Sequence, residues 1–174
     1  MMTLSIIGIH AHKETHMKLF QATFEHIDAI YRITQRVVLE SYPHYYPAPA
    51  VKFMSDYHDK EKIGRDIREG TILMLATDQG VLAATGTARN HEIGRLFVLP
   101  EYQGQGMGTA LMDELEKIVF QSYDRIQLDA SLPAKPMYIK RGYKEIRYEV
   151  QSVGDGDFVC FSVMELKKWG DRCE

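Results

Sequence analysis

Three glycines alternate at positions 104, 106 and 108 within the segment Leu96–Thr109, which reads LFVLPEYQGQGMGT. An apolar, strand-like run precedes them and an amphipathic stretch from Met107 to Gln121 follows, so the segment predicts a strand, a loop and a helix in direct succession. The first N–H groups of a helix have no intrahelical partner and lie at the positive end of the helix dipole. Glycine also lets a ligand approach the backbone closely. The segment therefore predicts a pocket for a phosphate or pyrophosphate group.

Two common nucleotide-binding motifs do not fit this loop. A P-loop ends in Lys-Ser or Lys-Thr, whereas Gly108 is followed here by Thr109 and Ala110. The dinucleotide-binding pattern G-x-G-x-x-G fails because Gly108 follows Gly106 one residue too early. A helix start that merely tolerates glycine is disfavoured too, since each glycine costs about 0.5–1 kcal/mol in a regular element.

The remaining periodicity predicts an α/β protein. Strands are expected over 18–22, 71–77, 81–88, 92–99, 125–129, 144–150 and 158–166, and helices over 23–42, 51–69 with a break near Asp59, 107–121 and 134–141. The segment Tyr42–Pro49 contains three prolines and is expected to be irregular. This order predicts a mixed sheet with helices on its faces.

The length of 174 residues suits a single domain. We expect this domain to span 17–168, with a polar tail over 169–174. The first 16 residues contain three histidines but no cysteine or carboxylate cluster with ligand spacing, so they are interpreted as an extension from an upstream start or a cloning junction, not as a metal site.

Charge and cysteine content exclude several classes of protein. Lys and Arg number 21 against 24 Asp and Glu, a net charge of −3, which does not favour a nucleic-acid partner. Cys160 and Cys173 match no zinc or redox spacing, so no metal is predicted and both are expected to be free thiols. No apolar run reaches the roughly 18–20 residues of a membrane span, and Leu4–Ile9 is too short for a signal peptide. We expect a cytoplasmic protein without a membrane partner.

The loop resembles a known family. Gln103–Gly108 fits the pattern Q/R-x-x-G-x-G/A of the GNAT superfamily of N-acetyltransferases, and Leu96-x-Val98-x-Pro100 resembles the family's fourth strand. The resemblance implies a GNAT-like three-layer sandwich, with a mixed, mostly antiparallel central sheet and helices on both faces. It also implies acetyl-CoA as co-substrate, with its pyrophosphate held by backbone amides of the loop.

A second match lies downstream in Ser131–Tyr143, SLPAKPMYIKRGY. Family members often show N-x-x-A-x-x-x-Y-x-x-x-G-F/Y here, which brings Ala134 and Tyr138 into register, with Ser131 in place of Asn. Pro136 departs from the pattern, so the helix is expected to start later or to kink. The two matches imply contacts of the co-substrate with Leu96, Phe97, Val98, Gln103, Gly104, Gln105, Gly106, Met107, Gly108, Thr109, Ser131, Ala134, Tyr138 and Arg141.

The resemblance also implies catalytic roles. A backbone amide near Val98 stabilises the oxyanion, and Tyr138 protonates the leaving sulfur; the alternative for Tyr138 is a core tyrosine. Glu92 begins the expected strand, where several family members carry a glutamate that deprotonates the amine through water. Strict alternation would place Glu92 on the face of Val98, but the family has a bulge here and a bulge reverses the alternation. A solvated turn glutamate remains an equal alternative. His91 is another candidate base, because an unperturbed imidazole changes its charge near physiological pH.

The acceptor pocket is expected near Tyr42, Tyr45 and Tyr46, which form a substrate lid, a packed aromatic loop or a dimer contact. For Arg141, a favourable charge at a helix end is the alternative to a CoA contact. The function implied is acetyl transfer from acetyl-CoA to a primary amine, of a small molecule, by direct attack in a ternary complex. The alternatives are a protein N-terminal or lysine acetyltransferase and a non-catalytic acyl-CoA-binding module. A homodimer is expected only by analogy with the family.

Overall fold

The computed structural model describes residues 17–154 and 156–168. The expected extension over 1–16 and the tail over 169–174 lie outside the described residues. The α-helices and strands follow the order β1 Lys18–Gln21, α1 Ile27–Ser41, α2 Ala48–Tyr57, α3 Lys60–Arg68, β2 Ile72–Ala76, β3 Leu82–Arg89, β4 Glu92–Val98, α4 Met107–Val119, β5 Arg125–Ser131, α5 Lys135–Lys140, β6 Lys144–Gly154 and β7 Asp157–Lys167.

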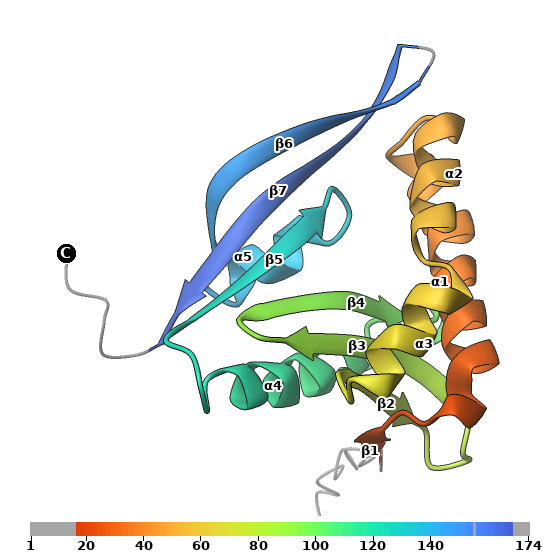
Figure 1. Ribbon diagram of the computed structural model, residues 1–174, viewed down its shortest axis with the longest axis vertical. Helices are drawn as coiled ribbons and strands as arrows, with labels where there is room; N and C mark the ends of the chain where they lie inside the picture. The colour runs from red at the N-terminus through yellow and green to blue at the C-terminus, as the bar shows by residue number, and fades with distance from the viewer. Residues whose placement is uncertain (1–16, 155, 169–174) are drawn as a thin grey trace, which may run out of the picture.

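All seven strands form one sheet in the order β1-β2-β3-β4-β5-β7-β6. Every neighbouring pair is antiparallel except β4 and β5, which are parallel. The β6–β7 hairpin extends away from β2–β4, and both of its strands contact α2 (Figure 1). The expected α/β fold with a mixed, mostly antiparallel sheet is confirmed.

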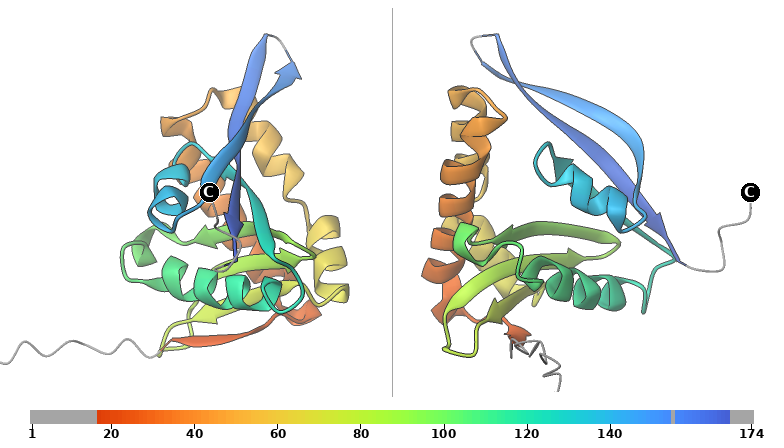
Figure 2. Two further views of the ribbon diagram at one scale, coloured as in Figure 1. Left: turned by 90° about the vertical axis from the view of Figure 1, so that its left-hand side faces the viewer. Right: turned by 180° about the vertical axis from the view of Figure 1, so that it is seen from behind.

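Helices cover both faces of the sheet, which makes three layers (Figure 2). Neighbouring residues of β2 show the division, because Met74 packs in the core beneath α1–α3 while Leu75 packs in the core beneath α4. Both side chains are fully buried. The short helix α5 belongs to the α4 side, where its Tyr138 is buried with Leu111 and Met112. No helix in the described part of the chain is long and apolar enough to cross a membrane.

The break expected near Asp59 separates α2 from α3. The Asp59 carboxylate accepts a hydrogen bond from the backbone N–H of Lys62 at 2.7 Å and so caps α3. The expectation of irregular structure over Tyr42–Pro49 is wrong at both ends of that segment. A 3₁₀ turn covers Tyr42–His44, and α2 already begins at Ala48 with Pro49 in its first turn, where a missing N–H costs nothing.

A bulge in β4 reverses the alternation of its side chains. Thr87 pairs with Gly94, but Thr85 already pairs with Phe97, so Arg95 and Leu96 together oppose one residue of β3. Ile93 therefore packs on the α4 side, whereas Phe97, four residues later, packs on the α1–α3 side. Glu92 shares its face with Phe97, so the bulge implied by the family resemblance is present.

Candidate active site

The strands β4 and β5 separate almost as soon as they meet. Their single register pair is Glu92 with Gln127, and the Gln127 N–H donates to the His91 carbonyl at 2.8 Å. Beyond this point the two strands diverge, which opens the sheet between its two halves. The Leu99 N–H donates to Ala83 of β3 at 2.9 Å, so by alternation the peptide groups of Val98 face the gap.

A side chain satisfies one of these exposed groups. Gln103 donates from Nε2 to the Val98 carbonyl at 2.9 Å, in the place a partner strand would have taken. The Val98 N–H also faces the gap and makes no backbone hydrogen bond to the strand β3. Within the described residues, β4 therefore presents an unpaired N–H donor at Val98, in the same cavity lining as the glycine loop.

The glycine loop has the conformation that its sequence predicts. Gly104 and Gly106 have φ of 72° and 84°, which other residues adopt only with strain, and Gly106 is the N-cap of α4. Gly108 lies inside the helix, where a β-carbon would sit 3.7 Å from Val98 Cγ2 and 4.0 Å from Met137 Sδ. These are ordinary contact distances, so packing does not require glycine at 108; its effect is to leave space in the gap.

A cavity of about 540 Å³ occupies this gap. It brings together most of the residues that the family resemblance assigns to the co-substrate: Leu96, Phe97, Val98, Gln103, Gly104, Gly106, Gly108, Thr109, Ser131, Ala134 and Tyr138. Tyr42 also lines this cavity. Val37, Ser41, Pro133 and Met137, which had no signal in the sequence, complete the lining. Glycines with positive φ, space at Gly108 and an open helix N-terminus together fit a long phosphate-bearing ligand.

Three predicted co-substrate residues do not line this cavity. The Gln105 side chain donates to the Glu101 carbonyl at 2.8 Å, and Met107 is buried in the core beneath α4. Arg141 forms ion pairs with Glu116 at 2.7 Å and with Asp113 at 2.6 Å. These ion pairs join the end of α5 to α4, whereas the helix-end charge and the CoA contact expected from the sequence stay predictions.

Tyr138 stands where two cavities meet. It is 5% exposed, packs edge-on against Tyr143, and its hydroxyl has no hydrogen-bond partner among the described residues. Burial, followed by the neighbouring Tyr42, raises the pKa of its phenol well above the ordinary value. The hydroxyl therefore keeps its proton at neutral pH and is available as a donor.

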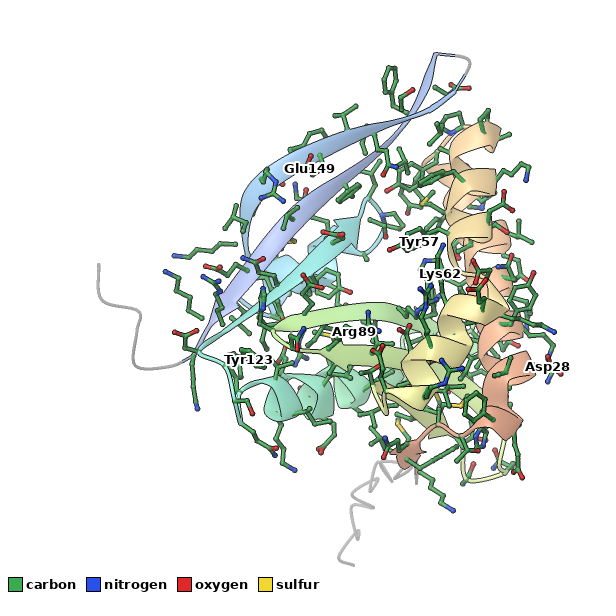
Figure 3. All side chains as sticks on the ribbon, viewed as in Figure 1. Asp28, Tyr57, Lys62, Arg89, Tyr123 and Glu149 are labelled. Atoms are coloured by element: carbon green, nitrogen blue, oxygen red, sulfur yellow. The ribbon has the colours of Figure 1, made fainter. Side chains whose placement is uncertain are left out.

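The second cavity measures about 850 Å³ and lies on the α1–α3 side. Tyr57, Lys62 and Arg89, labelled in Figure 3, line it from α2, α3 and β3. It shares six residues with the first cavity, Tyr42, Leu96, Phe97, Ser131, Ala134 and Tyr138, so the two spaces adjoin at Tyr138.

Two carboxylates line the second cavity at the point where β4 and β5 separate. Glu92 lies on β4 and Asp129 on β5. Burial raises the pKa of the Asp129 carboxyl, and the neighbouring Glu92 charge raises it further. His91, the other base considered, instead packs its ring 6.0 Å from that of Tyr123 and does not line the cavity.

The three predicted lid tyrosines occupy different environments. Tyr42 lines both cavities and donates to Ser131 Oγ at 3.3 Å. Tyr46 is buried at the edge of the second cavity and bonded to the backbone. Tyr45 is 53% exposed and lines neither cavity. The aromatic cluster is therefore split between the site and the surface.

Sequence reasoning missed a polar group on the wall of the second cavity, made by His58, Asp66 and Arg95. The Arg95 guanidinium donates to Asp66 at 2.8 Å and to His58 at 3.0 Å. One local signal was present, since a strand that enters the core carries an arginine between Gly94 and Leu96. Its partners come from distant α2 and α3 segments, which no local pattern reveals.

The model of the GNAT acetyltransferase domain matches residues 41–168, which include every residue that lines the two cavities except Val37. The chain belongs to the GNAT family of acetyltransferases. It is similar in structure to a GCN5-related N-acetyltransferase from Rhodopseudomonas palustris, with a TM-score of 0.75 and 23% identity over 86% of this chain and 94% of that one.

Two further similar structures were determined with coenzyme A or acetyl-CoA bound. The PaiA N-acetyltransferase of Thermoplasma acidophilum, in complex with coenzyme A, gives a TM-score of 0.66 and 19% identity over 87% of this chain and 99% of that one. The putative acetyltransferase YncA of Salmonella typhimurium, with its cofactor acetyl-CoA, gives a TM-score of 0.67 and 15% identity over 87% of this chain and 94% of that one. At these identities the likeness concerns the fold, which agrees with the GNAT architecture found here.

Proposed function

We propose that this GNAT protein transfers an acetyl group from acetyl-CoA to the primary amine of a small molecule, by direct attack in a ternary complex. The observation that supports this most strongly is the meeting of two cavities at Tyr138, one beside the glycine loop and one beside two carboxylates. A donor and an acceptor that enter from the two sides come into contact there. The acceptor cavity of about 850 Å³ has the size of a small-molecule site.

The first cavity holds the donor. The free N–H groups at the start of α4 bind the pyrophosphate, and the gap at Gly108 admits the arm that reaches toward Tyr138. Acetyl-CoA supplies an activated acetyl group and a thiolate leaving group. Gln103 keeps the Val98 peptide in place by bonding to its carbonyl, so that the N–H of the same residue stays directed into the gap.

Val98 and Tyr138 then serve the two places where negative charge develops. The Val98 N–H stabilises the oxyanion that forms when the amine nitrogen adds to the acetyl carbon. As the C–N bond forms and the C–S bond breaks, Tyr138 gives its proton to the departing sulfur. Its raised pKa suits this role, because the phenol stays protonated until a stronger base appears beside it.

Glu92 and Asp129 receive the proton of the amine. Both line the acceptor cavity at the edge where β4 and β5 part, and burial together with the Glu92 charge raises the pKa of the Asp129 carboxyl. A carboxyl whose pKa is raised toward neutrality is a better base than a free aspartate. The pair also attracts a cationic amine before the proton leaves.

Thermal unfolding with and without acetyl-CoA tests the donor site, with NADH and ATP as controls. Acetyl-CoA at about 100 times its Kd adds about 2.7 kcal/mol to the free energy of unfolding, which raises Tm measurably. Release of CoA thiol in the presence of a panel of primary amines then tests the transfer. A Tm increase without thiol release from any amine would contradict the proposed reaction and favour a non-catalytic acyl-CoA-binding protein.

A further inference from the structure

A charged side chain is buried in the wall of the acceptor cavity. Arg95 lies in the β4 bulge with φ of 48°, and its side chain is only 9% exposed. Placing a guanidinium there is costly unless its donors and its charge are matched. The bulge thus directs an arginine into the acceptor cavity, whose lining also includes Tyr138.

The protein provides hydrogen-bond acceptors for only some of the N–H donors of Arg95. Arg95 donates from Nε to Asp66 Oδ2 at 2.8 Å and from Nη1 to His58 Nδ1 at 3.0 Å. A guanidinium carries five N–H donors, so three remain, one on Nη1 and two on Nη2. These three have no hydrogen-bond partner among the described residues. A planar array of this kind matches a two-oxygen anion.

His58 orients the guanidinium without repelling it. Burial, followed by the charge of Arg95, lowers the pKa of His58 to about 3. The ring is therefore neutral at physiological pH, and its Nδ1 can accept from Arg95. Phe97 and Tyr57 hold the imidazole edge-on at centroid distances of 5.1 Å each. Arg95 is thus preorganised, with its remaining donors left for a ligand.

The cavity has two walls of opposite charge. On the side formed by α3, the end of β3 and the β4 bulge, Asp66 and Glu69 are set against four cations, Lys62, Arg65, Arg89 and Arg95. Arg89 pairs with both carboxylates, and Lys62 also pairs with Asp59, which lies outside the lining. With Asp59 included, four positive and three negative charges leave a surplus of one positive charge on that wall. Where β4 and β5 separate, Glu92 and Asp129 carry negative charge, and Arg147 of β6, which pairs with Glu149, also lines the cavity there. A ligand with an amine at one end and an anionic group at the other complements both walls.

We propose that Arg95 binds a carboxylate of the acceptor, so that the substrate is a small amine that also carries a carboxylate, as an amino acid does. The inference rests on the proposed function and specifies its acceptor. The carboxylate takes the free donors of Arg95, and the amine faces Glu92 and Asp129. Asp66 and His58 are positioning residues, since they act on the ligand through Arg95.

Matched pairs of amines test the carboxylate preference. Each of a panel of L-amino acids is compared with its amide, which keeps the amine and side chain but lacks the negative charge. For the best acceptor, kcat/KM from CoA thiol release should exceed that of the amide by about 100-fold or more, since an unmatched buried donor set penalises the neutral analogue. Arg95→Gln should reduce this ratio to within a few-fold of one, and Arg95→Lys should give an intermediate value.

Arg68→Gln is the matched control, because Arg68 is an exposed arginine of α3 that lines neither cavity. It should leave the ratio at its original value. The Tm increase with acetyl-CoA shows that each variant folds and binds the donor. A ratio that is unchanged in Arg95→Gln, or already near one in the unaltered protein, would overturn the assignment.

A binding measurement separates this inference from the transfer reaction. With CoA present, N-acetyl-L-amino acids should raise Tm more than the corresponding N-acetyl amino amides, whether or not turnover is seen. If no amine releases thiol, the proposed function fails, while this comparison still decides the role of Arg95. Equal Tm values with the N-acetyl amino acids and with their amides would overturn the proposed binding of a carboxylate by Arg95. A preference for phosphoethanolamine over ethanolamine, without any preference for carboxylates, would show that the site binds a phosphate group. That result would overturn the proposal that Arg95 binds a carboxylate.

Discussion

The Tyr46 hydroxyl accepts a hydrogen bond from the backbone N–H of Leu132 across 2.7 Å. It also donates to the Cys160 carbonyl at 3.0 Å, so a single side chain between α1 and α2 bonds to the end of β5 and to β7. These contacts join the helical side of the acceptor cavity to the strands that form its other side. Tyr46 therefore has a structural role in the predicted lid, because it holds the helical side and the strands together.

Removing that hydroxyl should cost stability. Tyr46→Phe leaves the Leu132 N–H and the Cys160 carbonyl without their partner, at a cost of about 1–3 kcal/mol in the free energy of unfolding. Urea unfolding measures this loss. Tyr45→Phe, at an exposed neighbour, should change the free energy by less than about 0.5 kcal/mol. Equal effects of the two substitutions would contradict the bracing role.

Gly108→Ala should affect stability and ligand binding in opposite directions. Alanine at a helical position with no protein clash should stabilise the free protein by about 0.5–1 kcal/mol, while the methyl group takes space from acetyl-CoA and weakens its binding about tenfold or more. Gly64→Ala is the control, because Gly64 lies in α3 and lines neither cavity. Its β-carbon would meet Ile27 Cδ1 of α1 at an ordinary contact distance of 3.8 Å. It should stabilise without changing the Kd for acetyl-CoA, measured by calorimetry.

Tyr138→Phe should impair turnover and spare donor binding. Loss of the general acid lowers kcat by about 10²–10⁴-fold. The Kd for acetyl-CoA should stay within a few-fold of its original value, because the ring and its packing against Tyr143 remain. Steady-state kinetics and calorimetry check the two parts. Unchanged kcat would show that another group protonates the sulfur.

The pH profile should report the carboxylate pair. The base must be ionised, so kcat/KM falls as the pH drops through the pKa of Asp129, which Glu92 helps to raise. Glu92→Gln removes the neighbouring charge, lowers the pKa of Asp129 and moves this acid limb to lower pH. Glu114→Gln, on the exposed face of α4, should leave the limb where it was. A limb that does not move in Glu92→Gln would exclude coupling between the two groups.

His58 should make the protein less stable in mild acid. Its folded pKa of about 3 lies below the unfolded value of about 6.5, so between these values the unfolded chain binds the proton more readily. Stability is therefore lost as the pH falls below about 6.5, by up to about 1.4 kcal/mol per pH unit. Urea unfolding at pH 7.5 and 5.0 measures the loss, and His58→Gln should show a smaller one. An equal loss in the unaltered protein and in His58→Gln would show that His58 does not cause the loss of stability in acid.

Local patterns predicted much of the fold. The strand, loop and helix around Gly106 follow from apolar periodicity and glycine spacing, and Asp59 marks the break between α2 and α3 as expected. The start of α2 at Ala48 was missed because prolines were read as helix breakers, although the first helical turn accepts them. Here the position within the helix mattered more than the residue type.

Much of the candidate site depends on tertiary contacts that periodicity does not reveal. Arg95 bonds to Asp66, 29 residues away, and to His58, 37 residues away. Only the folded chain brings α3 and the residue that ends α2 to the bulge of β4. The bulge that turns Arg95 inward breaks the alternation on which strand predictions rely. The role of Tyr45 was likewise undecided, because exposure depends on how the loop packs.

The separation of β4 from β5 has a consequence for how the molecule keeps its shape. Apart from the pairing at Glu92 and Gln127, no strand hydrogen bonds join these two halves of the sheet in the described part of the chain. Their remaining backbone groups at the gap are held by Gln103 or left to solvent. A ligand in that gap thus takes the place of a missing row of hydrogen bonds, and the donor substrate becomes part of the architecture while it is bound.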